Sequence, residues 1–159
     1  MSFDDWILSL HVLSAFAFAG GTVLFWVLIL AVRRTDTPSG TIRMAPAVRI
    51  GNAATGIGMG GTIVLGIWLA FSVGSYDIWD GWIVAALVLW ILAAATGGRT
   101  GAAYREGMTK AQELRAAGQD GPNPELLAVN RTQRGLIMHA LTTLILVLIL
   151  IDMIWKPGA

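Results

Sequence analysis

The two histidines of the chain, His11 and His139, are the first candidates for chemistry. Each lies within a long apolar stretch, the first near the start of the chain and the second near its end. Polar side chains inside such stretches are functional candidates by default when the stretch crosses a membrane. Two histidines on facing membrane helices suggest the axial ligands of a b-type haem.

Depth argues against one haem shared by both histidines. His11 lies five residues after Trp6, which is roughly 7 Å along a helix. His139 lies sixteen residues before Trp155, which is roughly 24 Å along a helix. If both tryptophans mark the same membrane surface, the two imidazoles differ in depth by about 16 Å. Two axial nitrogens on one iron are only about 4 Å apart, so the remaining cofactor hypothesis is haem b coordinated by His11.

Asp152 matches the depth of His11 better, because it lies three residues before Trp155. An imidazole and a carboxylate at one level can share a hydrogen bond or a proton, which would suit a proton-coupled transporter. Two simpler alternatives remain open. Asp152 would reach the outer interface, and His11 would bond a hydroxyl or carbonyl group across the bundle.

A second group of polar side chains shares similar depths in the inner half of the apolar stretches. It would form a half-channel or a ligand vestibule if its members meet. Interhelical hydrogen bonds, often worth ~1 kcal/mol or less per pair in membranes, are the interpretation that we favour. The members are Asn52, Thr55, Thr96, Arg99, His139, Thr142 and Thr143.

Four apolar stretches must position these side chains. Of the 159 residues, 55% are hydrophobic and 13% are charged, and this charged fraction is about half of that in a typical soluble domain. Each stretch is long enough to cross the hydrocarbon of a bilayer, which takes roughly 17–25 residues. We predict an all-α four-helix transmembrane bundle, one domain over 1–159, with spans at about 6–32, 46–73, 81–98 and 135–155.

The positive charges predict an orientation. All Lys and Arg residues except Lys156 lie in two connecting segments, 33–49 and 99–134. Such segments face the cytoplasm in bacterial inner-membrane proteins. We therefore expect a multi-pass protein of the bacterial inner membrane, N-out and C-out, with the connection at Tyr76 outside. Residues 99–134 are expected to form a cytoplasmic helical hairpin, whose second helix opens at Asn123-Pro124 and continues into the last span.

The composition excludes several classes of function. The chain has no cysteine, so disulfides and thiolate chemistry are excluded. No phosphate loop, zinc site or catalytic triad is recognisable, so we assign no catalytic or metal-binding residue and expect no enzyme activity. The formal net charge of +1 indicates no nucleic-acid partner. The acidic residues before the first span argue against a cleavable signal peptide.

Gly56 and Gly60 form a GxxxG pair in the span at 46–73. Small residues at this spacing let helix backbones approach closely in lipid. We favour packing against another span of the same chain, and a dimer face is the alternative.

Several short motifs carry a resemblance to known proteins. The run Leu-His-Val-Leu-Ser-Ala at 10–15, closing at the Gly pair 20–21, resembles the first span of a family of small bacterial four-helix integral membrane proteins of unknown function. The Gly-Ile-Trp-Leu-Ala run at 66–70, Trp82 and the Trp-Lys-Pro-Gly run at 155–158 match the same family.

The first-span pattern is also similar to that of CopD-like copper-resistance proteins and HemJ-type protoporphyrinogen oxidases. The second resemblance implies that His11 is a haem ligand. The chain differs from both groups at Phe18, where a tryptophan is usual, and no second haem ligand matches.

The function that we expect is that of a small, non-catalytic accessory or assembly subunit. Its partners would be the lipid bilayer and either further copies of the chain or another membrane complex. The alternatives are a haem-b-binding or redox protein using His11, and a proton-coupled transporter using His11 with Asp152.

Overall fold

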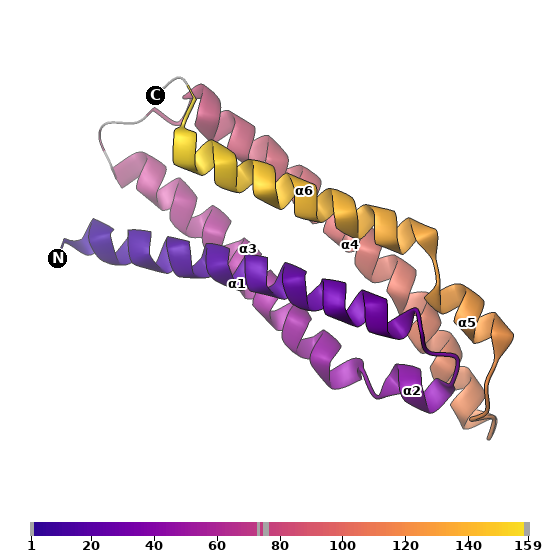
Figure 1. Ribbon diagram of the computed structural model, residues 1–159. Coiled ribbons are helices and arrows are strands. Elements are labelled where there is room, and N and C mark those ends of the chain that lie inside the picture. Colours follow the sequence, from indigo (N-terminus) through magenta and orange to yellow (C-terminus); the bar gives the residue numbers. More distant parts are fainter. Residues whose placement is uncertain (1, 73, 75–76, 158–159) are drawn as a thin grey trace.

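The computed structural model describes residues 2–72, 74 and 77–157. The predicted end of the second span at Val73, the connection at Tyr76 and the last glycine of the 155–158 motif lie outside the described residues. The described residues form helices and no strand (Figure 1). The helices are α1 (Phe3–Val32), α2 (Pro38–Ile42), α3 (Ala45–Ser72), α4 (Gly81–Ala116), α5 (Pro124–Asn130) and α6 (Gln133–Trp155).

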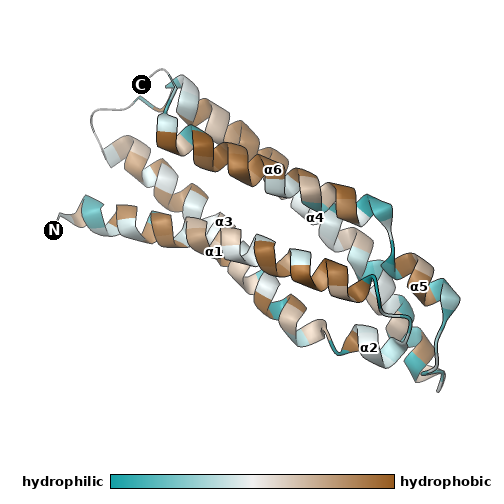
Figure 2. Ribbon diagram, viewed as in Figure 1, coloured by the Kyte–Doolittle hydropathy of each residue, from teal (hydrophilic) through white to brown (hydrophobic). Residues whose placement is uncertain are grey.

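Four helical stretches are long and apolar enough to cross a membrane: Phe3–Val32, Pro38–Ser72, Gly81–Ala116 and Pro124–Trp155. Hydrophobic residues cover most of their length, and hydrophilic residues gather around α2, α5 and the end of α4 (Figure 2). The predicted all-α fold with four membrane helices is confirmed.

Local signals in the sequence set where two of the helices begin. Ser2 and Asp5 form a reciprocal capping box at the start of α1, with the Ser2 amide 2.6 Å from the Asp5 carboxylate. The side chain of Asn123 accepts the amide of Leu126 at 2.9 Å, directly before Pro124 opens α5. Both caps pair amides that a helix leaves without an internal partner.

The long helices pair as two hairpins, α1 with α3 and α4 with α6 (Figure 1). Glycines let α1 and α3 approach closely. A Cβ atom at Gly58 of α3 would collide with the backbone of Phe18, and one at Gly21 of α1 would collide with Thr55. Backbone contact of this kind replaces the hydrophobic effect as the source of helix association in lipid.

The two hairpins meet near the middle of the long helices. Phe18 of α1 shares a buried cluster with Ala93 of α4 and with Leu146 and Ile149 of α6. The indole of Trp90 also donates to the carbonyl of Met59 at 3.1 Å, which joins α4 to α3. From this contact the hairpins diverge toward the end where α1 begins and α6 ends (Figure 1).

The opposite end is closed by α2, α5 and the continuation of α4. Asn130 of α5 is 1% exposed, and its amide donates to the Thr35 carbonyl and the Thr41 hydroxyl, both at 3.0 Å. Leu126 and Ala111 are fully buried beside this layer. The segment that follows α1 is therefore fixed against the second hairpin.

The chain leaves helical geometry between α5 and α6, at Arg131 and Thr132, which differs from the predicted continuous helix. Arg33 of the first hairpin donates to the carbonyls of Arg131 at 2.8 Å and Thr132 at 2.9 Å. Gly135 follows, where a Cβ atom would lie 2.7 Å from the ring of Tyr104. Contacts distant in sequence thus stabilise a break that no proline or glycine at 131–132 signals.

Candidate functional site

A cavity of about 690 Å³ lies between the two hairpins, in the half of the molecule where they diverge. All four long helices contribute to its walls, which are mainly apolar. Trp90 and Ile149 line it beside the central cluster, and Asp4, Asp5 and Lys156 line it near the helix ends. Its volume lies within the roughly 300–1,000 Å³ of small-molecule and cofactor sites.

His11 is the imidazole in this cavity, and it stands on α1 against Gly66 of α3. A Cβ atom on Gly66 would lie 3.0 Å from Cε1 and 3.3 Å from Nδ1 of the ring. Nδ1 is buried and makes no hydrogen bond within the described part of the chain. Nε2 is thus the nitrogen left to reach a molecule in the cavity.

His139 has a different environment at the contact between α1 and α6. It is 3% exposed, and its Nε2 lies 3.1 Å from the carbonyl oxygen of Thr22. Its ring packs edge-on against Trp26, with 4.9 Å between centroids. Thr22 is eleven residues after His11, or about 16 Å along α1. The two imidazoles therefore occupy separate levels, and His139 joins the two hairpins.

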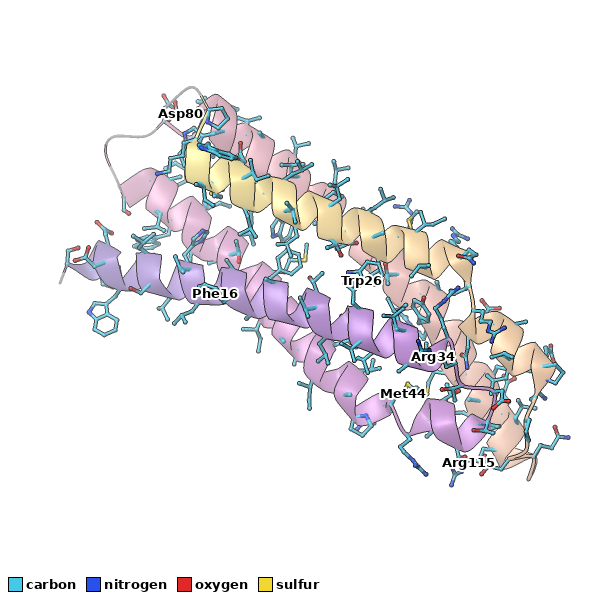
Figure 3. All side chains as sticks on the ribbon, viewed as in Figure 1. Phe16, Trp26, Arg34, Met44, Asp80 and Arg115 are labelled. Carbon is cyan, nitrogen blue, oxygen red and sulfur yellow. The ribbon has the colours of Figure 1, made fainter. Side chains whose placement is uncertain are left out.

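Two further hydrogen bonds use residues of the predicted inner polar group. The Thr142 hydroxyl of α6 donates to the Thr96 hydroxyl of α4 at 2.8 Å, within the second hairpin. The Trp26 indole of α1 donates to the Thr143 hydroxyl of α6 at 2.9 Å, between the hairpins. Figure 3 shows Trp26 at this junction.

The other members of the predicted inner group lie apart. Thr55 faces Gly21 in the α1–α3 contact, and its buried hydroxyl has no hydrogen bond among the described residues. Asn52 and Arg99 are exposed on α3 and α4. Five of the seven residues therefore contribute to separate helix contacts, and the group does not surround one vestibule.

Asp152, near the C-terminal end of α6, does not line the His11 cavity. It is 8% exposed, and its Oδ2 is buried without a hydrogen bond among the described residues. It lines a separate groove of about 400 Å³, together with Leu89 of α4 and Trp155 of α6. Within the described residues no hydrogen bond or ion pair joins Asp152 to His11.

Gly56 and Gly60 face away from α1. A Cβ atom on either residue would have no neighbour within 4 Å. The glycines of α3 that do contact α1 are Gly51, Gly58, Gly61 and Gly66.

Gly66 packs against His11 and Trp26 against His139, and neither contact was predicted from the sequence. Gly66 belongs to the 66–70 motif, and its distance from the end of the second span matches the depth of His11. That match could have indicated the contact. Among the described residues, no three His, Asp or Glu side chains gather as a metal site.

Comparison with known proteins places the chain in a family. Residues 5–157 match the model of the family described as predicted integral membrane protein (DUF2269). The chain belongs to this family, which confirms the resemblance to small integral membrane proteins of unknown function. Searches of curated proteins and of solved structures gave no match. The resemblance to CopD-like and HemJ-type proteins stays a prediction.

Proposed function

We propose that this membrane protein is a non-catalytic subunit that binds haem b in the cavity between its hairpins, with His11 as the iron ligand. The observation that carries the proposal is a single imidazole in an apolar cavity of about 690 Å³. Histidine is a common axial ligand of haem iron, and an apolar surrounding suits the porphyrin.

The residues present fit this group. Nε2 of His11 would bind the iron, because Nδ1 is buried against α3 beside Gly66. Ala15, Ala19 and Ala86 place small side chains on the cavity wall, and Trp90 lines the cavity beside the central cluster. Bound haem would supply one-electron transfer to a partner complex. The protein's own part is to hold the ring, exclude water and set the iron's surroundings.

Absorption spectra of the purified protein from haem-replete cells test the proposal. We expect a Soret band that is lost in His11→Ala and kept in His139→Ala, because His139 bonds Thr22 outside the cavity. A colourless wild-type protein would contradict the proposal, as would a band that survives His11→Ala unchanged.

We also propose the finer localisation, in the inner membrane of a bacterium with both chain ends outside. Arg34 and Arg115 lie at one end of the molecule and Asp80 at the other (Figure 3). The ends of the chain lie on the Asp80 side (Figure 1). This separation of charges supports the orientation that the positive-inside rule predicts.

Self-association is a second proposed property, and the GxxxG pair favours it, because a Cβ atom on either glycine would have no neighbour within 4 Å among the described residues. Gly56 and Gly60 present bare backbone on the face of α3 turned away from α1. Gly56→Leu with Gly60→Leu should reduce crosslinked dimer in native membranes at least several-fold. Gly20→Leu is the matched control, because Gly20 also lacks neighbours but stands on α1. An equal dimer yield in all three proteins would refute self-association through this face.

A further inference from the structure

The carboxyl group of Asp152 is buried near the outer end of α6, and nothing in the described chain accounts for its second oxygen. The side chain is 8% exposed, and Oδ2 has no hydrogen bond among the described residues. An ionisable group in such a place is costly unless a partner pairs with it. A hydrogen-bond donor, preferably a cation, would stabilise the ionised form of this carboxyl group.

Lys156 is the cation nearest in sequence, one turn after Asp152. Its backbone amide donates to the Asp152 carbonyl at 2.8 Å. Its ammonium group lies 5.3 Å from the centroid of the Trp82 ring, and it lines the His11 cavity. No ion pair between the two side chains is present in the described structure. The side chain of Lys156 is therefore directed elsewhere.

The surroundings of the carboxyl define what can pair with it. The groove of about 400 Å³ has apolar walls from Leu89, Leu148, Ile151 and Pro157, and Trp155 adds an indole ring. Leu148, Ile151 and Trp155 are exposed on the surface of α6. A molecule in the groove therefore contacts apolar side chains, one carboxylate and one aromatic face. Carboxylates and indole faces both attract ammonium groups.

We propose that this groove binds a membrane lipid with a primary ammonium headgroup, with the ammonium at the groove-lining Asp152 carboxylate and an acyl chain along Leu148 and Ile151. The groove lies within one turn of Trp155, at the depth where lipid headgroups meet the hydrocarbon. A lipid reaches such a site from the bilayer. The inference is independent of the haem proposal, because the His11 cavity lies between the hairpins.

Lipid retention tests the inference with the full-length protein. The protein is released from nanodiscs containing equal parts of phosphatidylethanolamine and phosphatidylcholine, and bound lipid is counted by native mass spectrometry. We expect preferential retention of phosphatidylethanolamine by the wild type and at least tenfold less in Asp152→Asn. Asp77→Asn is the control, because Asp77 is exposed at the same end and lies outside the groove.

A groove-filling variant and a soluble probe complete the design. Leu148→Trp keeps the carboxyl group and should still lower retention, so a folding defect specific to Asp152→Asn cannot explain the result. Equal retention of the two lipids, or equal retention by wild type and Asp152→Asn, would overturn the proposal. Binding of dodecylamine without retention of the lipid would also overturn it. The Soret band of the Asp152→Asn protein reports separately on the haem proposal.

Discussion

His11 and His139 carry the same imidazole, but their neighbours give them different roles. Nε2 of His139 is hydrogen-bonded to the Thr22 carbonyl, and the ring packs against Trp26. Contacts within the chain thus satisfy both the polar atom and the apolar surface of this side chain. His11 lines a cavity and has a buried Nδ1 without a hydrogen bond among the described residues. A side chain whose polar atom is already bonded within the fold is poorly suited to bind a ligand, which is why we propose His11 and not His139 as the haem ligand.

Replacement of His139 by alanine should therefore destabilise the protein. The variant loses the contact with the Thr22 carbonyl and the edge-on packing on Trp26. We expect a loss of about 1–3 kcal/mol in the free energy of unfolding. Denaturation by SDS in mixed micelles, followed by tryptophan fluorescence, measures it. His11→Ala in haem-free protein is the comparison and should lose much less. Equal losses would show that His139 has no special part in joining the hairpins.

At the scale of the helices, α3 has two sets of glycines with different surroundings. Gly58 and Gly66 receive the backbone of Phe18 and the ring of His11. A Cβ atom on Gly56 or Gly60 would have no neighbour within 4 Å in the described part of the chain. The GxxxG spacing indicated a close helix approach without telling which face makes it, because every face of α3 carries small residues.

Alanine substitutions, each of which adds one methyl group, should distinguish the two sets of glycines by their effect on stability. Gly58→Ala should destabilise the protein by about 1–3 kcal/mol, because the new Cβ atom would collide with the backbone of Phe18. Gly56→Ala should have no cost in a monomer, and the higher helix propensity of alanine would add up to about 1 kcal/mol. Thermal unfolding in detergent compares the two variants. A larger loss in Gly56→Ala would contradict the observed pairing of α1 with α3.

At the scale of the whole molecule, the two hairpins are in contact in the middle. They are held together at one end and diverge at the other. Hydrogen bonds of Asn130 and Arg33 join the hairpins at the end that contains α2 and α5. The other end diverges around the cavity. A closed polar end and an open apolar end suit a scaffold that holds a ligand near one membrane surface.

The absence of cysteine in the sequence offers a direct test of orientation. Asp77→Cys should react with an impermeant maleimide added outside intact cells, because it lies three residues before Asp80, which stands at the end of the molecule where the chain begins (Figure 3). Arg115→Cys should react only after the membrane is opened. The reverse pattern would place both chain ends in the cytoplasm and contradict the proposed topology.

The number of spans and several helix starts could be predicted from the sequence, because hydropathy, capping residues and proline act locally. The distance between the two histidines followed from the regular rise of a helix. The break at Thr132 could not be predicted, because Arg33 stabilises it from almost a hundred residues away. Nor could the separate placement of His11 and Asp152, because depth along a helix does not specify which face points to which neighbour.

Haem titration tests the central claim most directly, with the cavity rather than the imidazole as the variable. Haem is added to three haem-free proteins: the wild type, Ala15→Trp and Val23→Trp. The first substitution fills the cavity one turn from His11. The second is the control, because it adds the same ring at an exposed position on α1. We predict saturation at one haem per chain for wild type and Val23→Trp, and at least tenfold weaker binding for Ala15→Trp. Equal binding by all three proteins, or no saturable binding by the wild type, would contradict a haem site between the hairpins.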